Sequence, residues 1–403
     1  MQQATAQANG DRKARSNALR LAAAQALAGA NATVVFATAA IIGSTLSSDP
    51  ALVTAPVSLF VVGMAAGTLP TGWLARRFGR RAAFMTGSFF GFMAGLIAAA
   101  ALLIGSFPLY CVATLCAGLY GAVVQSFRFA AADSASHAFR PRAISWVMVG
   151  GIFSGVLGPQ LVTWTMNLWP PYLFAASYLA QAVVALVAMA VLSGVDLPRP
   201  TRADTAKGRP LGVIARQPRF VVAVLCGVIT YTLMNLVMTS APLAMRMCGL
   251  PVSASNATIQ WHVVAMYGPS FFTGGLIARF GAQRVVAAGL LLLAGAAASG
   301  LAGISIAHFT LGLVLLGVGW NFGVVGASSL VRETHRPEER TRVQSFNDFL
   351  IFGTMAVGSF SSGQLLLSWG WDSVNWVVLP PVVLGLLALL FSGALRRRVV
   401  EVA

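Results

Sequence analysis

The chain has 403 residues, of which 57% are hydrophobic and 9% are charged, whereas soluble globular proteins carry about 25% charged residues. That composition excludes an ordinary water-soluble fold. The formal net charge of +16 would also fit a nucleic-acid-binding protein. The distribution of the basic residues along the chain distinguishes that class from a membrane protein.

Long apolar windows dominate the sequence. A helix needs about 20 apolar residues to cross a bilayer core, and windows of that length without charge predict an all-α membrane protein. In chain order, the twelve predicted transmembrane helices cover 19–45, 51–74, 82–104, 106–128, 144–166, 171–195, 219–244, 254–278, 285–304, 306–331, 343–368 and 373–395.

Polar segments divide these helices into two sets of six. We expect an N-terminal tail at 1–18, a linker at 196–218 and a C-terminal tail at 396–403, which leaves six-helix halves at 19–195 and 219–395. The linker is rich in Pro, Arg and small polar residues and cannot span a membrane. The first apolar run is longer than a signal-peptide core, so it is expected to stay as a membrane anchor.

The basic residues are distributed unevenly about the predicted helices. If all twelve cross the membrane, the two termini and every second loop share one side, and that side holds 26 of the 27 Lys and Arg residues, leaving only Arg246 opposite. Retained Lys and Arg mark the cytoplasmic face. The pattern therefore predicts a cell (inner) membrane protein with both termini cytoplasmic, no nucleic-acid partner, and arginines in reach of anionic lipid head groups.

Two loops repeat the same sequence. "GWLARRFGRR", which starts at Gly72, is followed 202 residues later by "GGLIARFGAQR", which starts at Gly274. The first loop aligns Gly72, Leu74, Arg77, Phe78 and Gly79 with Gly274, Leu276, Arg279, Phe280 and Gly281 of the second. A further echo pairs "RPRAISW" at 140–146 with "RTRVQSF" at 340–346. The two halves are therefore expected to be pseudo-symmetric copies of one unit.

The first loop resembles the signature Gly-x-Leu-Ala-Asp-Arg-x-Gly-Arg-Lys of the major facilitator superfamily. The matching positions are Gly72, Leu74, Ala75, Arg77, Gly79 and Arg80, with Arg81 in place of the lysine. The resemblance implies a monomeric secondary transporter whose two halves rock about a central site for a small molecule. Arg76 departs from the signature, because it stands where the family has an aspartate.

The reversed charge at Arg76 suggests a reversed latch. In the resembled family the aspartate lies against the start of helix eleven, where the helix dipole favours a negative charge. Here the predicted helix eleven carries Asp348 near its start. We therefore expect Arg76 or Arg77 to pair with Asp348, and Arg80 with Asp133, at the cytoplasmic side; the alternative is that Asp348 pairs locally or is solvated.

Amide and aromatic side chains within the predicted helices are the candidates for substrate contact. A buried amide needs a partner that lipid does not supply, so these amides either line a cavity or join helices. The candidates are Asn31, Phe36, Gln125, Trp146, Gln160, Tyr231, Asn235, Trp261, Tyr267, Trp320 and Asn321.

Ionisable groups are scarce inside the predicted helices. His262 is the one group there that titrates near neutral pH, so it is the candidate for proton coupling, with hydrogen bonding within its helix as the alternative. The four cysteines lack the spacing of metal ligands. No serine-hydrolase, metal or phosphate-loop signature is present, so we expect neither enzymatic activity nor a cofactor or metal.

The residue types favour a flat, uncharged ring compound as substrate, because Trp and Tyr can border it and amides can read its edges. Three segments, "SFRFAAADSASHAFRPRAISWV", "WPPYLFAASYLAQA" and "QWHVVAMYGPSFFTG", are similar to bacterial superfamily members described as riboflavin transporters. Riboflavin or a comparable heterocycle is the expected solute. Proton-coupled efflux of hydrophobic drugs or metabolites, and a non-transporting membrane receptor or scaffold, are the alternatives.

Overall fold

The computed structural model describes residues 2–135, 139–197, 208–336 and 339–401, and the long elements within them are all α-helices. The first bundle contains α1 (Gln2–Leu46), α2 (Ala55–Phe78), α3 (Arg80–Ile104), α4 (Phe107–Val124), α5 (Phe127–Asp133), α6 (Arg140–Thr165) and α7 (Ala175–Ser193). The second contains α8 (Leu211–Ala215), α9 (Pro218–Met247), α10 (Val252–Tyr267), α11 (Ser270–Phe280), α12 (Ala282–Ala302), α13 (Ile306–Arg332), α14 (Arg340–Trp376) and α15 (Leu379–Glu401).

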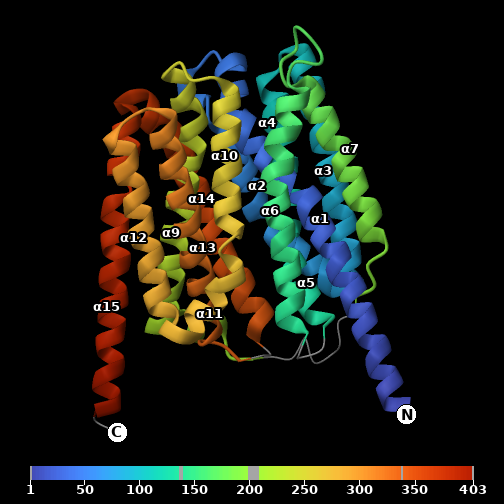
Figure 1. The fold of residues 1–403 in the computed structure, drawn as a ribbon, viewed down its shortest axis with the longest axis vertical. Coiled ribbons are helices and arrows are strands. Elements are labelled where there is room, and N and C mark those ends of the chain that lie inside the picture. Colours follow the sequence, from blue (N-terminus) through green and yellow to red (C-terminus); the bar gives the residue numbers. More distant parts are fainter. Residues whose placement is uncertain (1, 136–138, 198–207, 337–338, 402–403) are drawn as a thin grey trace.

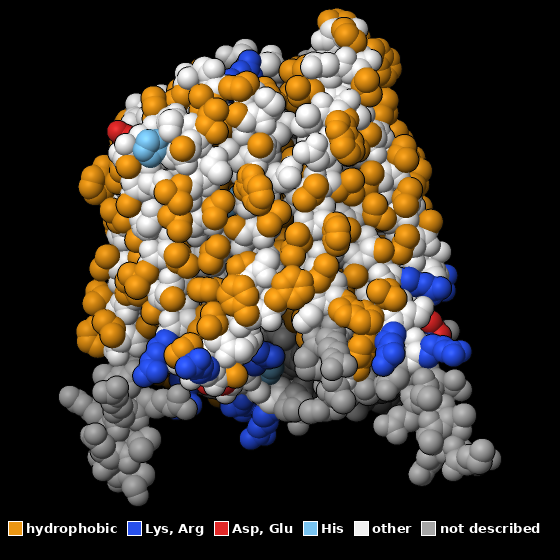
Figure 2. Space-filling view, viewed as in Figure 1, with side chains coloured by type: hydrophobic (Ala, Val, Ile, Leu, Met, Phe, Trp, Pro, Cys, Tyr) orange, Lys and Arg blue, Asp and Glu red, His pale blue; other side chains and the backbone are white. Residues whose placement is uncertain are grey.

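The two bundles stand side by side, and both chain termini lie at the same end of the molecule (Figure 1). We call this the termini end and the opposite one the far end. Hydrophobic side chains cover the flanks in view, and Lys and Arg gather mainly at the termini end (Figure 2). Because apolar side chains face outward along the helices, the flanks suit lipid and the termini end suits water or head groups.

Ten helical segments in the described residues are long and apolar enough to cross a membrane, against the twelve helices expected. The expected helix at 254–278 consists of α10 and α11, each shorter than a span, with a break at Gly268 and Pro269. Proline lacks the backbone N–H that would continue the helix. The expected helices at 343–368 and 373–395 largely coincide with one segment, Arg342–Phe391, and Gly370 between them has a non-helical backbone with φ 79° and ψ −179°.

The terminal segments differ from the expected tails. Helix α1 begins at Gln2, so most of the expected tail at 1–18 is the first part of that helix, and α15 continues to Glu401. The start of α1 is attached to the residues after α7: Lys13 Nζ lies 2.5 Å from a carboxylate oxygen of Asp196, and Asn17 Nδ2 donates to the Asp196 carbonyl oxygen at 2.6 Å. Residues 198–207 of the expected linker at 196–218 lie outside the described residues.

The repeated loops have the same backbone conformation. Gly79, between α2 and α3, has φ 86° and ψ 160°, and Gly281, between α11 and α12, has φ 83° and ψ 151°. This region of backbone space is essentially restricted to glycine, and no atom crowds either position. The two aligned glycines are therefore required by the turn itself.

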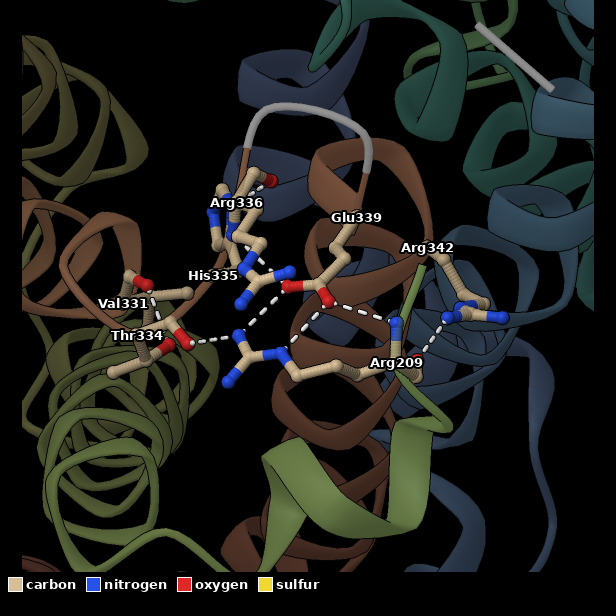
Figure 3. Close-up of polar contacts among 7 residues, drawn as sticks. All are labelled: Arg209, Val331, Thr334, His335, Arg336, Glu339 and Arg342. Carbon is tan, nitrogen blue, oxygen red and sulfur yellow. Dashed lines mark hydrogen bonds and ion pairs between the residues drawn. The ribbon is translucent and has the colours of Figure 1, made fainter. Parts of the chain in front are cut away.

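A buried carboxylate holds the end of the linker to the second bundle (Figure 3). The Glu339 side chain, directly before α14, has no exposed surface. Its Oε1 accepts hydrogen bonds from the backbone N and the Nε of Arg209, both at 2.8 Å. Its Oε2 accepts from Arg209 Nη2 at 2.8 Å and from the Arg336 backbone N at 2.9 Å. The carboxylate thereby ties the linker to the loop between α13 and α14.

This anchor extends beyond Glu339. Arg209 Nη2 also donates to the Thr334 carbonyl oxygen at 3.2 Å, and Arg342 donates to the Arg209 carbonyl oxygen. Helix α8 follows directly, and its fully buried Ile214 packs in a small core with Phe220 of α9. The Arg209 guanidinium and then the Arg336 amide, by hydrogen bonding, hold the pKa of Glu339 well below its usual range.

We expect Glu339→Gln to lower the thermal unfolding temperature of the detergent-solubilised protein at neutral pH, because Arg209 loses its charged partner. A carboxyl group whose pKa is depressed in the folded state contributes stability above its unfolded pKa, about 4.3, and loses that contribution as the pH falls below it. The difference between wild type and variant should therefore shrink below about pH 4. Glu333→Gln, at an exposed position, is the control. A difference that does not change with pH contradicts this role of the charge.

Candidate functional site

Four aromatic side chains of the second bundle form a cluster. Tyr231 of α9 has its ring centroid 5.2 Å from that of Trp320 in α13 and 5.7 Å from that of Phe352 in α14. Tyr267, the last residue of α10, lies 6.1 Å from Trp320. All three contacts are edge-to-face, the arrangement that aromatic quadrupoles favour. We call Tyr231, Tyr267, Trp320 and Phe352 the aromatic cluster.

The cluster borders the first bundle. The Tyr267 ring occupies the space next to Gly151 of α6, where any Cβ atom would collide with it. One turn earlier in α10, Val263 lies against Gly155 of α6 in the same way. The small residues of α6 therefore let α10 approach closely, and they place the cluster at the boundary between the bundles.

Two opposite charges flank this cluster, one from each bundle. Arg128 of α5 is half-buried and interacts electrostatically with Tyr231, Tyr267 and Asp348. Asp348 of α14 also interacts with Tyr231, and it accepts a hydrogen bond from Asn347 Nδ2 at 3.1 Å. No direct ion pair joins Arg128 to Asp348. The aromatic cluster therefore has one cation and one anion within electrostatic reach.

The aromatic cluster contains three of the residues expected from the sequence: Tyr231, Tyr267 and Trp320. Sequence reasoning missed Arg128, because it was assigned to the end of a helix at 106–128. Arg128 could have been found as a charged residue inside the apolar segment Phe107–Ala132. A charge there is costly unless it has a function or a partner. Trp320 Nε1 is buried and has no hydrogen-bond partner among the described residues.

Two of the expected amides join helices. Asn31 Nδ2 donates to the Ala117 carbonyl oxygen at 3.2 Å, and its Oδ1 accepts from Gln181. Asn235 is fully buried, and its Nδ2 lies 3.5 Å from the Met355 carbonyl oxygen. Both side chains are within a bundle, which agrees with the interhelical alternative for these amides.

Asn321 supports the break between α10 and α11. Its Nδ2 donates to the Met266 carbonyl oxygen at 2.6 Å and to Ser270 Oγ at 2.7 Å, and its Oδ1 accepts from Thr273 Oγ1 at 2.7 Å. The Met266 carbonyl stands just before the break at Gly268 and Pro269, and Ser270 and Thr273 follow it. One amide from α13 therefore binds groups on both sides of the break.

The remaining candidates lie apart from the cluster. Phe36 packs edge-to-face on Phe60 at 5.6 Å, and Trp146 on Phe139 at 5.3 Å. Gln125 ends α4. Trp261 is 55% exposed and lies about a third of a turn from Gln260, the neighbour that contacts α6. Trp261 thus projects away from the boundary between the bundles.

His262 is fully buried in α10. Its Nδ1 donates to the Leu313 carbonyl oxygen of α13 at 2.7 Å, because a carbonyl can only accept. Its Nε2 has no partner among the described residues. The ring is therefore held by one bond to the neighbouring helix, whereas the structural alternative expected a bond within its own helix, and Nε2 stays unpartnered among the described residues.

The expected latch is only partly within the described side chains, because those of Arg76 and Asp133 lie outside them. Gly72 and Leu74 belong to the last turns of α2, and Arg80 and Arg81 begin α3. The guanidinium of Arg77 lies over the rings of Trp73 and Phe78, at 5.8 and 5.6 Å. In the second loop Arg279 lies over Phe280 at 5.1 Å, so the aligned arginines behave alike. Arg77 and Asp348 are not paired in this structure.

Side-chain hydrogen bonds join the two bundles near the far end. Ser58 Oγ of α2 donates to Ser359 Oγ of α14 at 3.0 Å, and Gln160 of α6 donates to Gln260 of α10 at 2.9 Å. Near the ends of α9 and α1, Arg246 Nη1 donates to Ser44 Oγ at 2.9 Å. These contacts hold the bundles together on the far side of the aromatic cluster.

Two helical bundles with a polar and aromatic site at their boundary, and direct contacts beyond it, define a secondary transporter that exposes its site to alternate sides of a membrane. The chain belongs to the Major Facilitator Superfamily, whose family model matches residues 21–268 and 252–401. It is a multi-pass membrane transporter of a small molecule.

Similar proteins cover nearly the whole chain. The riboflavin transporter RfnT of Brucella anthropi is 49% identical over 380 residues, which are 94% of this chain and 96% of that protein. The uncharacterized MFS-type transporter YdeG of Bacillus subtilis is 30% identical over 359 residues, 85% and 84% of the two chains. The solved structure of the xylose transporter XylE from E. coli, in a partially occluded inward open conformation, superposes with a TM-score of 0.71 at 14% identity, covering 94% and 97%; this likeness concerns the fold.

We expect Asn321→Ala to destabilise the protein by a few kcal/mol, because it removes the hydrogen bonds to the Met266 carbonyl oxygen and to the Ser270 and Thr273 hydroxyls, and a buried polar group that loses its partner costs about 1–3 kcal/mol. Thermal unfolding in detergent measures the change. Asn235→Ala is the matched control: Asn235 is equally buried but makes a single bond of 3.5 Å, so its effect should be smaller. Equal losses would contradict the role assigned to Asn321.

Proposed function

We propose that this transporter carries riboflavin or a comparable flat heterocycle, and that the ring binds at the aromatic cluster between Arg128 and Asp348. The observation that carries the proposal is the 49% identity with a riboflavin transporter over 94% of the chain. The residue types agree with such a ligand, since Tyr231, Trp320 and Phe352 bring aromatic rings together at the boundary, and aromatic rings pair favourably with other planar rings. The opposite charges leave the site without a net charge, which suits a neutral solute.

Further parts of the proposal concern the membrane. The gathering of Lys and Arg at the termini end (Figure 2) supports cytoplasmic termini, contact with anionic head groups there, and a location in the cell membrane. The protein acts as a monomer and as a carrier without chemistry of its own. A proton is the proposed coupling ion, with His262 as its candidate site. Uptake that is unaffected both by collapse of the proton gradient and by His262→Ala would contradict proton coupling.

The contacts at the far end support alternating access in which that end is closed here. For the site to open there, Ser58 and Ser359 must separate. The latch of Arg76 or Arg77 with Asp348, and of Arg80 with Asp133, is proposed for the opposite state, in which the termini end closes. Arg76→Asp combined with Asp348→Arg should then recover transport that each single change loses.

We expect riboflavin to raise the unfolding temperature of the purified protein. A ligand at 100 times its dissociation constant stabilises the folded state by about 2.7 kcal/mol if it does not bind the unfolded chain. Trp320→Leu should abolish most of this shift, whereas Trp369→Leu, at a position 76% exposed, should keep it. A raised unfolding temperature with several unrelated lipophilic compounds would favour efflux instead. If riboflavin still raised the unfolding temperature of Trp320→Leu by the same amount, the ligand would bind outside the aromatic cluster.

A disulfide between Ser58→Cys and Ser359→Cys should stop transport. The two hydroxyl oxygens are 3.0 Å apart, so cysteines at these positions are placed to form a bond in a background without the four native cysteines. Oxidation should remove most uptake of riboflavin into proteoliposomes, and a reductant should restore it. The single variants should respond to neither reagent. Full uptake with the disulfide formed would show that the far end does not open.

A further inference from the structure

A cavity of about 340 Å³ lies at the termini end of the second bundle, where α11 meets α12 (Figure 1). Its volume falls within the range of about 300–1,000 Å³ that is common for small-molecule sites. Its walls come from the start of α9, the turn between α11 and α12, and the end of α13. The lining includes Arg219, Val222, Phe280, Arg284, Leu330 and Glu333. No residue of the aromatic cluster contributes to it, so this cavity is separate from the proposed substrate site.

Two guanidinium groups and one carboxylate line this cavity. Arg219 belongs to the first turn of α9, Arg284 belongs to the first turn of α12, and Glu333 directly follows α13. Neither arginine forms an ion pair or a hydrogen bond with Glu333 or with another side chain in the described parts of the chain. The hydrogen-bonding capacity of all three groups is therefore open to a ligand in the cavity.

The positions of these charges oppose the helix dipoles. A positive side chain is unfavourable near the start of a helix, and a negative one is unfavourable near its end. Neither α9 nor α12 carries an acidic residue in its first turn that would offset the arginine. Retention on the cytoplasmic face explains why basic residues gather at this end, but it does not explain Glu333 in the same cavity. The three charges therefore fit a shared ligand better than they fit the stability of the helices.

The charged side chains determine the polar part of that ligand. Arginine forms paired, charge-assisted hydrogen bonds with phosphate oxygens. The two arginines and Glu333 leave one net positive charge, which balances the single negative charge of a phosphodiester better than a phosphate monoester, whose charge is about −1.5 to −2 at pH 7. The carboxylate of Glu333 accepts hydrogen bonds, so the ligand carries donor groups close to the phosphate.

The apolar part of the lining indicates that the phosphodiester comes from the membrane. Val222 and Leu330 are half-buried, and Phe280 is 45% exposed. The guanidinium of Arg279 lies 5.1 Å from the centroid of the Phe280 ring, which adds positive charge beside the cavity. Apolar walls next to arginines suit a head group that is attached to acyl chains. Basic pockets between transmembrane helices on the cytoplasmic side bind the head groups of anionic lipids.

We propose that this cavity binds the head group of an anionic phospholipid, with Arg219 and Arg284 donating to its phosphate oxygens and Glu333 accepting from hydroxyl groups next to the phosphate. The inference deepens the head-group contact proposed above, because it rests on the termini end lying at the membrane surface, and it does not depend on which solute is carried. Phosphatidylglycerol has a singly charged phosphodiester and two hydroxyl groups in its head group. Phosphatidylcholine has the phosphodiester but no hydrogen-bond donor.

The test counts the lipids bound to the purified protein in a non-ionic detergent by native mass spectrometry, as each lipid is titrated. We expect the first phosphatidylglycerol to bind the wild-type protein at least about tenfold more tightly than phosphatidylcholine, because hydrogen bonds to charged groups are strong. Arg219→Gln combined with Arg284→Gln should remove this preference. Arg12→Gln combined with Arg15→Gln, the same loss of charge at exposed positions of α1, should keep it. Inorganic phosphate at millimolar concentration should not displace the lipid.

Equal affinities of the wild-type protein for the two lipids would overturn the inference without reference to any variant. Displacement of the lipid by inorganic phosphate would also overturn it, because the cavity would then take a soluble phosphate compound. Equal losses in the two double variants would show contact with head groups in general and contradict a site at the cavity. The unfolding temperature of each variant shows whether it is folded. A wild-type protein that does not bind riboflavin would contradict the proposed substrate and leave this inference standing.

Discussion

The need to satisfy backbone hydrogen bonds away from water governs this structure. In a bilayer, only helices satisfy nearly every N–H and C=O within their own segment, which explains why the described chain is built almost entirely of helices. At Gly268 and Pro269, where the helix is interrupted, Asn321 of α13 binds the Met266 carbonyl oxygen. The interruption ends α10 at Tyr267, next to Trp320 and at the boundary with α6.

Polar side chains consequently have two separate uses. Asn31 and Asn321 bind carbonyl groups and other side chains within one bundle, and thereby fix how its helices pack. The proposed site at the boundary instead combines aromatic rings with Arg128 and Asp348, which form no ion pair with one another. This division lets each bundle stay rigid while the boundary between the bundles can change, which is what alternating access requires.

Much of the fold was predictable from the sequence, and less of the site. Apolar windows placed most helices to within a few residues, because membrane helices differ from their loops in composition. The candidates Tyr231, Tyr267 and Trp320 come together, but Trp261, one residue from Gln260, faces away. Arg128 was missed because its neighbours in space, Tyr231 and Asp348, are more than a hundred residues distant in the sequence. The direction of a side chain depends on helix rotation and packing, which composition does not reveal.

The sequence by itself determined that the chain is a helical membrane protein made of a repeated unit, because hydrophobicity, the distribution of arginines and the two aligned loops are local properties. Gly79 and Gly281 are also determined locally, since the backbone conformation of each turn by itself requires glycine. Only the tertiary structure decided which polar residues serve packing and which surround the site. Whether a buried amide or charge is satisfied depends on partners that other helices bring, and those partners are fixed only when the bundles have packed.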